Sequence, residues 1–340
     1  MTYNSSTLLT GLAAVPSFNS SLLATGTQPS FLSQIYANNW IGVRPRFNQF
    51  LANLNPTQNQ IDDARTKLRA ITRCLNQAYW NSSSETDNTE MVGSWGKGTC
   101  IRPPTDADMI FLLPNEVYWR FDKRGGNKQS DLLQEVKGCL ESTYPQTTMR
   151  GDGQVVMVRF NSICFEVVPA FIPESCDGII ICDTNNGGRY KITYPLDERR
   201  RIQNCNAAFN SNAIHLIKMA KCWRKACSVP IPSFHLEHLA VDFVDQWPHR
   251  GRDAFWYDWM MRDFFIWLAI QHRQSPLSRL RYMLASREYD DPFASDWQSK
   301  TDTAVSRAVK ACNLEYNNQT VEAGQEWQKI FGDDIPVYVL

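Results

Sequence analysis

The chain has 340 residues, which at roughly 150 residues per domain suggests two lobes or one large domain. Hydrophobic residues make up 43% of the chain, a fraction that excludes a disordered protein. The 35 basic residues balance 35 acidic ones, so the net charge gives no sign of the basic surface typical of nucleic-acid-binding proteins.

The sequence predicts neither a membrane span nor a secretory signal. The longest apolar runs, such as residues 264–270, are much shorter than the ~20 residues that cross a bilayer. The N-terminus carries no positive charge before Leu8, and Thr10 and Gly11 interrupt the apolar stretch that follows. We therefore expect a cytoplasmic protein that has no membrane partner.

Ten cysteines are spread over the chain without a CxxC pair, so they predict reduced, mostly buried thiols rather than a disulfide framework. A zinc site is the alternative interpretation. Its ligands would come from Cys176, Cys182, Cys222, Cys227, His235 and His238. Their spacing matches no known four-ligand pattern, so zinc is the weaker interpretation.

The first region of the predicted organisation is an uncharged N-terminal extension, residues 1–44. As far as Val43 it contains no Asp, Glu, Lys, Arg or His, and it is rich in Ser, Thr and Asn. Such a segment is typical of a loose tail or of an arm packed on the core. Order is expected from about Arg46, and the catalytic lobe is predicted over 45–200.

A long helix begins the catalytic lobe and runs from residue 57 to about Trp80. Thr57 can cap this helix, and Gln60, three residues later, completes a capping box. Apolar residues then recur at helical spacing. A polar loop over 81–90 follows.

Strands and one further helix complete the first half of the chain. A buried strand, a helix and the two strands of an antiparallel hairpin are predicted over 106–113, 130–144, 155–160 and 163–168. Pro114 ends the first strand, and Asn161-Ser162 forms the hairpin turn. Residues 177–198 are expected to form a loop and a short strand.

Helices follow one another from about residue 200. They are predicted over 206–227, 233–246, 253–271, 277–288, 299–314 and 320–331. Gly332 stands where a helix-ending glycine is expected. Strands in the first half and helices in the second indicate an α+β chain, with a mixed-sheet N-terminal lobe and a helical C-terminal lobe over 201–340.

The stretch VGSWGKGTCIRPPTDADMIFLL, residues 92–113, carries the chemistry. Asp106 and Asp108 stand two residues apart on the predicted strand, so their side chains point to one face and can share divalent cations. Gly93 lets the backbone approach a phosphate closely, and Ser94 adds a hydroxyl and backbone N–H groups. These are the parts that hold a nucleoside triphosphate against two metal ions. The alternative is a Gly-rich turn followed by an edge strand with two solvated aspartates.

Glu166 is the predicted third carboxylate of this site. It is the one charged residue in the apolar run 163–168, where burial is costly unless the side chain is paired or binds metal. Two alternatives stay open: Glu166 faces water from an edge strand, or Asp152 is the third ligand. The sequence Gly151-Asp152-Gly153 is typical of a turn, which favours Glu166.

In these residues the chain resembles the bacterial CD-NTases, which serve the CBASS antiphage system. The CD-NTases are polymerase β-type nucleotidyltransferases related to oligoadenylate synthetase and cyclic GMP-AMP synthase. The stretches that carry the resemblance are GSWGKGTCIRPPTDADMIFLLP (93–114), FEVVPAF (165–171), LIKMAKCW (216–223), SFHLEHL (233–239) and EWQKIFGDDIP (326–336). They run in the family's order over about residues 45–336. The resemblance implies a bilobal nucleotidyltransferase fold with a long spine helix and a helical C-terminal lobe like that of oligoadenylate synthetase.

The resemblance also implies roles for individual residues. The catalytic metals, Mg²⁺ or alternatively Mn²⁺, would be bound by Asp106, Asp108 and Glu166. The donor triphosphate would be held by Gly93 and Ser94, and its terminal phosphates would be reached by Lys221 and Ser233. Lys218, one turn before Lys221, is a weaker candidate for the same role.

Three departures from the family pattern limit these implications. The third acid is Glu where many relatives have Asp, and the uncharged N-terminal extension matches nothing in the family. The His and Cys zinc insertion of cyclic GMP-AMP synthase is also missing, so DNA sensing by that route is not expected.

The implied activity is synthesis of a cyclic di- or trinucleotide messenger from NTPs, with release of pyrophosphate. ATP is expected among the substrates, the second base is left open, and a separate effector would read the product. A nucleic-acid partner is not required, since a long nucleic acid would favour a basic flank. The alternatives are a linear oligonucleotide synthetase or an RNA nucleotidyltransferase, and a nucleotide-binding module without catalysis.

Overall fold

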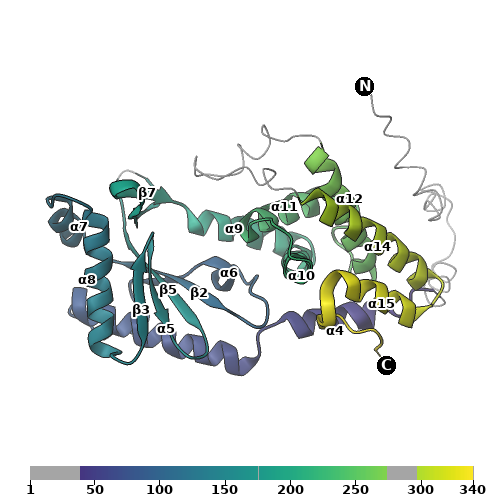
Figure 1. Cartoon of the computed structure of the whole chain (residues 1–340), viewed down its shortest axis with the longest axis horizontal. Helices are drawn as coiled ribbons and strands as arrows, with labels where there is room; N and C mark the ends of the chain where they lie inside the picture. The colour runs from purple at the N-terminus through teal and green to yellow at the C-terminus, as the bar shows by residue number, and fades with distance from the viewer. Residues whose placement is uncertain (1–38, 175, 274–296, 340) are drawn as a thin grey trace.

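The computed structural model describes residues 39–174, 176–273 and 297–339. Figure 1 shows two halves: the strands lie with helices α5, α7 and α8, and the helices from α9 onward lie together with α4. The predicted α+β class is therefore confirmed.

The strands form one mixed sheet in the order β1-β2-β5-β4-β3, and β6 pairs with both β5 and β7. Their bounds are β1 Thr89–Met91, β2 Asp106–Leu112, β3 Thr148–Asp152, β4 Val155–Arg159, β5 Cys164–Phe171, β6 Ile179–Asp183 and β7 Arg189–Thr193. The predicted hairpin is confirmed, because β4 and β5 pair antiparallel. Strand β2 pairs parallel with β5, which brings the two acidic segments side by side. Over 177–198 the structure has two strands, β6 and β7, rather than one.

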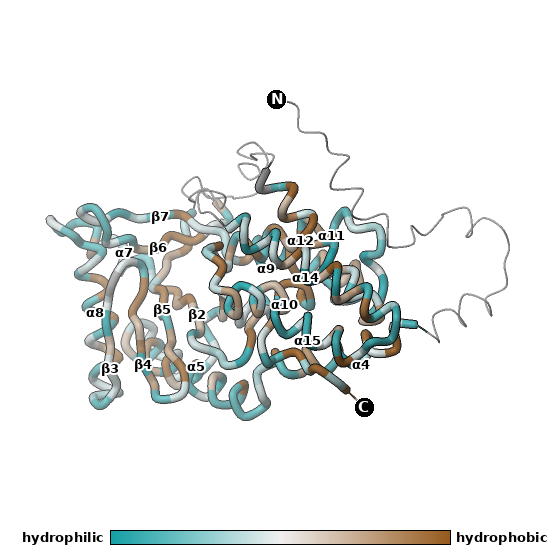
Figure 2. Tube along the Cα trace, turned by 45° about the vertical axis from the view of Figure 1, so that its right-hand side comes forward, coloured by the Kyte–Doolittle hydropathy of each residue, from teal (hydrophilic) through white to brown (hydrophobic). Residues whose placement is uncertain are grey.

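Three helices of the N-terminal half cover one face of this sheet: α5 Gln58–Tyr79, α7 Asn115–Asp122 and α8 Lys128–Thr143. The short helix α6, Gly93–Gly96, lies against Asp108 on the other face. Side chains alternate between the faces of a strand, so Ala107, Met109 and Phe111 of β2 pack in the core with α5 and α8. Asp106 and Asp108 are thereby placed on the opposite face. In Figure 2, β4 and β6 are among the most hydrophobic parts of the chain.

The capping box predicted for the long helix is present. The backbone N–H of Gln60 donates to Thr57 Oγ1, and the backbone N–H of Thr57 donates to Gln60 Oε1 at 2.9 Å. Helix α5 runs beneath the sheet as the predicted spine (Figure 1).

Helix α4, Val43–Leu54, was not expected from the sequence. Its apolar side, with Phe47 and Phe50 fully buried, belongs to the core of the helical half rather than to that of the sheet. Packing also begins before the expected start at Arg46, because Trp40 is already buried and its N–H donates to the carbonyl of Glu315. A division at residue 45 therefore falls inside α4.

The helical half is built from α9 Pro195–Ala208, α10 Asn212–Ala226, α11 Ser233–Gln246, α12 Tyr257–Arg273, α14 Gln298–Tyr316 and α15 Thr320–Phe331. The predictions over 233–246, 299–314 and 320–331 are confirmed to within two residues, whereas the one over 277–288 lies outside the described residues. The helix expected over 206–227 is wrong at its start: α9 and α10 are separate helices, with a break at Phe209–Ser211. Within the described ranges, no helix is both long and apolar enough to cross a membrane.

Candidate active site

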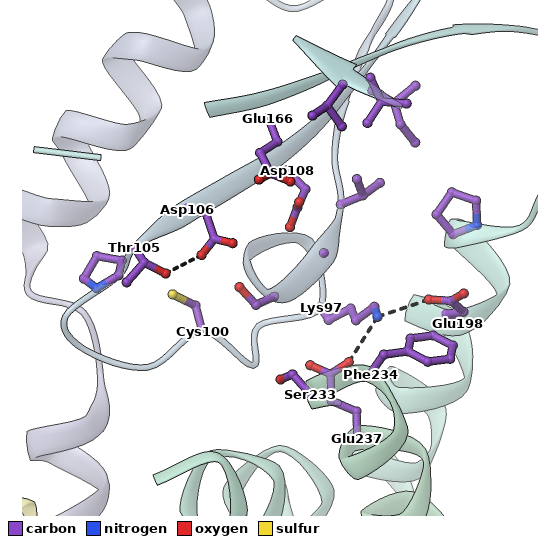
Figure 3. Close-up of a pocket in the computed structure, with 18 of the residues that line it drawn as sticks. Lys97, Cys100, Thr105, Asp106, Asp108, Glu166, Glu198, Ser233, Phe234 and Glu237 are labelled. Carbon is purple, nitrogen blue, oxygen red and sulfur yellow. Dashed lines mark hydrogen bonds and ion pairs between the residues drawn. The ribbon is translucent and has the colours of Figure 1, made fainter. Parts of the chain in front are cut away.

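The parallel pairing of β2 with β5 brings two of the predicted carboxylates together. Asp108 is the register partner of Glu166, and in a parallel pair facing residues point to the same side of the sheet. Figure 3 shows their carboxyl groups directed toward one another on the face that the helices leave open. Asp106, two residues earlier on β2, lies on the same face.

Gly93 lies directly against this pair. Its φ of +57° is in the left-handed region, and a Cβ atom there would stand 1.7 Å from Asp108 Oδ2. Only glycine leaves room for the turn to pass beside the carboxylate. Ser94 follows in the same turn, and both residues line the cavity described below.

The carboxylates repel one another in a partly buried setting. Burial raises the pKa of Asp108, and the charge of Asp106 raises it further. Burial and the charges of Asp108 and Asp106 raise the pKa of Glu166 to about 7. Crowded negative charge of this kind is relieved by a bound cation.

The chemistry of these side chains fits a hard divalent cation. Carboxylate oxygens are the ligands that Mg²⁺ prefers. Asp106 is exposed, and one of its carboxylate oxygens accepts a hydrogen bond from Thr105 Oγ1 (Figure 3). As the side chains stand, no three His, Cys, Asp or Glu residues in the described part of the chain form a group that could hold a metal ion. A site that uses all three carboxylates would therefore require their side chains to move closer together.

A cavity of about 820 Å³ opens in front of the carboxylates, between the two halves. Sheet residues Ile110, Val168, Ile179 and Ile181 give it an apolar wall. Helices α10 and α11 supply the opposite wall, which carries the cations Lys221, Arg224 and Lys225. The volume is within the range of small-molecule sites, and the charges suit a polyanion.

The residues predicted to contact the terminal phosphates differ in their positions. Lys221 and Ser233 both line the cavity, from α10 and from the first residue of α11. Lys218 does not line it: its Nζ donates to Asn55 Oδ1 at 2.7 Å. Burial lowers the pKa of Lys218. Lys218 therefore lies outside the cavity and contacts Asn55 instead.

Comparison with known proteins agrees with this geometry. Residues 42–206 match the family model "Second Messenger Oligonucleotide or Dinucleotide Synthetase domain". A probable cyclic nucleotide synthase of Bacillus cereus strain VD146 is 26% identical over 280 residues, covering 72% of this chain and 81% of the relative. The cyclic AMP-AMP-GMP synthase of Enterobacter hormaechei subsp. hoffmannii strain UCI 50 is 23% identical, covering 87% of this chain and 92% of the relative.

A solved structure shows the same fold. The cyclic AMP-GMP synthase DncV of Vibrio cholerae, in complex with the linear intermediate 5' pppA(3',5')pG, superposes with a TM-score of 0.65 at 15% identity. The superposition covers 88% of this chain and 98% of DncV. Together these similarities support a CD-NTase, with the matched family domain over residues 42–206.

The cavity also holds charged residues that the sequence analysis did not identify. Lys97 and Glu237 are both buried, and Lys97 Nζ lies 3.0 Å from Glu237 Oε2 and 3.1 Å from Glu198 Oε2. A sequence signal for Glu237 existed: it stands four residues after Ser233 in one helix, so both share a face. Its partner Lys97 lies 140 positions away, and only the fold brings the two together.

The ten cysteines are free thiols, as the sequence predicted. Among the described residues, the ligands considered for zinc form no group of three or more. Cys222 instead donates to the carbonyl of Phe331, and Cys227 to the carbonyl of Ile330. These thiols join α10 to α15.

Proposed function

We propose that this CD-NTase makes a cyclic oligonucleotide messenger from NTPs, with release of pyrophosphate, in CBASS antiphage defence. The observation that supports it most is the register of β2 and β5. It sets Asp108 beside Glu166, against the Gly93 turn, at the wall of a cavity of nucleotide size. ATP is the expected first substrate, and a separate effector would read the product.

Three carboxylates of the sheet would hold the metal ions: Asp106, Asp108 and Glu166. We propose Mg²⁺, with Mn²⁺ as the alternative, which when bound would lower the pKa of the acceptor hydroxyl and neutralise the leaving pyrophosphate. To bind a metal ion, Asp106 would give up the hydrogen bond that it accepts from Thr105. The protein itself does little covalent chemistry in such a transfer, so positioning dominates.

The triphosphate would lie between the two walls of the cavity. Gly93 and Ser94 would bind it through the backbone and hydroxyl of their turn, and Lys221 and Ser233 would reach its terminal phosphates from the helices. The apolar wall of the sheet would exclude water from the reacting groups. A second transfer within the linear product, whose ends both reach the cavity, would close the ring.

The decisive experiment incubates the protein with all four NTPs and Mg²⁺ and identifies the products by mass spectrometry after phosphatase treatment. We expect a phosphatase-resistant cyclic product. Phosphatase-sensitive chains would instead establish the linear synthetase. Binding of NTPs without any release of pyrophosphate would establish the non-catalytic module.

A double variant ties the activity to the proposed carboxylates. Asp106→Asn with Asp108→Asn should reduce product formation roughly a thousandfold or more, since metal-assisted charge stabilisation contributes several kcal/mol. The fold should persist, because the exchange removes mutual repulsion. The matched control is Asp62→Asn with Asp63→Asn on α5, two carboxylates that do not line the cavity, which should retain full activity. Wild-type turnover in the first variant would contradict the assignment.

A further inference from the structure

One buried carboxylate connects the two halves of the molecule at the cavity. Glu237 of α11 is 3% exposed. It accepts a hydrogen bond from Thr99 Oγ1 at 2.7 Å and lies 2.5 Å from Lys221 Nζ and 3.0 Å from Lys97 Nζ. Lys97 and Thr99 belong to the sheet half, whereas Lys221 and Glu237 belong to the helical half.

Backbone hydrogen bonds within the turn from Gly93 to Thr99 connect Lys97 and Thr99 to the predicted phosphate-binding residues, Gly93 and Ser94. The N–H of Lys97 donates to the carbonyl of Gly93 at 3.1 Å, and the N–H of Thr99 donates to the carbonyl of Ser94 at 2.9 Å. Fixing Lys97 and Thr99 therefore fixes Gly93 and Ser94 as well.

The ammonium group of Lys221 also contacts this cluster, through Glu237 and Thr99. Besides Glu237, its Nζ donates to the carbonyl and the hydroxyl of Thr99, at 3.2 and 3.0 Å. Three N–H groups are all that a lysine has. These partners orient the side chain, and a phosphate bound to Lys221 would replace one of them.

The charges in this cluster are closely balanced. Burial raises the pKa of Glu237, but Lys221 and Lys97 outweigh it, so that the pKa lies below its ordinary value. Burial lowers the pKa of Lys97, but the nearby carboxylates of Glu237 and Glu198 have the larger effect. The pKa of Lys97 is therefore raised above its ordinary value. Ionised groups that are this buried persist only when they are paired and hydrogen-bonded.

We infer that Glu237 is a positioning residue for triphosphate binding: it holds Lys221 of one half and the Gly93–Thr99 turn of the other in a fixed relation across the cavity. The inference rests on the proposed function, which assigns the phosphates to that turn and to Lys221. Glu237 itself touches neither the phosphates nor the reacting atoms. It sets where the groups that do touch them stand.

A purely electrostatic role would have the opposite sign. If Glu237 did no more than neutralise the lysines, removing its charge would make the cavity more positive and would strengthen binding of a polyanion. If Glu237 positions the lysines and the turn, the same change weakens binding.

Thr99→Val tests positioning without a change of charge. The variant loses the hydroxyl that donates to Glu237 and accepts from Lys221. We expect the Kd of a non-hydrolysable ATP analogue and the KM for NTP to rise about fivefold, with kcat within about twofold, as for an interaction made alike in the bound and transition states. The matched control is Thr301→Val, a buried threonine of α14 that donates to Trp297 and lies outside the cavity.

Glu237→Gln tests whether removing the charge weakens or strengthens nucleotide binding. We expect the Kd of the analogue to rise about tenfold, since interactions of buried charges are stronger than those of neutral groups. The control is Glu326→Gln, which also removes a carboxylate bound to two lysines, Lys310 and Lys329, on helices away from the cavity. A merely structural role would lower the melting temperature of Thr99→Val and leave its Kd unchanged, which would overturn the inference.

The outcomes separate this inference from the proposed function. A wild-type protein that binds the analogue but forms no product overturns the catalytic proposal, while the Kd values of the variants still decide the role of Glu237. Product formation with an unchanged or lower Kd in both variants overturns the positioning role alone. A wild-type protein that binds no NTP overturns both.

Discussion

At the scale of single residues, the contact between Gly93 and Asp108 explains how a turn and a strand share one small site. The turn adopts a positive φ and passes so close to the carboxylate that no side chain fits between them. The same closeness would place a phosphate held by the turn next to the carboxylates.

Gly93→Ala should therefore act on stability and activity together. The left-handed conformation alone costs an alanine ~1–2 kcal/mol, and the Cβ would also displace Asp108. A displacement of about 1 Å at a reacting centre can cost about a hundredfold in rate, which is the loss expected in a pyrophosphate-release assay.

Gly126→Ala is the matched control, because its φ is +72° and its Cβ would meet no atom within 4 Å. It should lower the melting temperature without changing turnover. Equal activity of the two variants would show that the Gly93 contact is not part of the site.

The residue scale also shows what the sequence could and could not reveal. The spacing of Asp106 and Asp108 and the lone Glu166 predicted their common face, because strand periodicity alone determines which side a residue faces. For Glu237 the sequence indicates only a helix face shared with Ser233, and a glutamate on an amphipathic helix is usually solvated. Its burial depends on Lys97 and Thr99, from another part of the chain.

At the scale of elements, helices with a cap and a regular apolar side were predicted correctly, whereas elements without apolar periodicity were missed. Helix α5 has a capping box and a regular apolar side, and it was predicted to within a residue at each end. Helix α9 begins at Pro195 with Asp197 and Glu198 in its first turn, which are helix-start signals. Its sequence carries few apolar residues, so periodicity did not show it. Strand β1 has only three residues and no periodicity to detect.

Thr57→Ala should weaken α5 at its first turn. The exchange removes the hydroxyl that accepts from Gln60 and should lower the free energy of unfolding by ~1 kcal/mol, measured by urea denaturation. Thr66→Ala in the same helix provides the contrast: its hydroxyl only donates back to the carbonyl of Asp62, and alanine is the better helix former. That variant should be as stable as the wild type or slightly more so. An unchanged midpoint in Thr57→Ala would show that the cap does not contribute.

At the scale of the whole molecule, α4 and α5 run in succession beneath the helical half and the sheet (Figure 1). The cavity lies between these halves, so its shape depends on how firmly α4 is held. Arg46 of α4 provides much of that attachment: it donates to Glu315 at 2.9 Å, to the carbonyl of Pro336 at 2.8 Å and to the carbonyl of Thr320 at 2.5 Å. The boundary predicted at residue 45 would place most of α4 with the sheet half, whereas the partners of Arg46 lie near the other end of the chain.

Two arginines of α4 allow this attachment to be tested within one helix. Arg46 and Glu315 are 1% and 0% exposed, whereas Arg44 and its partner Asp253 are 57% and 52% exposed. Arg46→Met leaves a buried carboxylate without its cation and should cost ~3–5 kcal/mol of unfolding free energy. Arg44→Met should cost no more than ~1 kcal/mol, since water screens exposed pairs.

The pH dependence of Arg46→Met distinguishes lost charge pairing from lost packing. Burial raises the pKa of Glu315, and without Arg46 to oppose burial the pKa should rise further. A carboxyl with a raised pKa in the folded state destabilises the fold above that pKa and ceases to do so once it is protonated. The deficit of Arg46→Met relative to the wild type should therefore shrink as the pH falls from 8 toward 5, while that of Arg44→Met stays constant. A deficit that does not change with pH would assign the role of Arg46 to packing, and α4 would then be held by its apolar side alone.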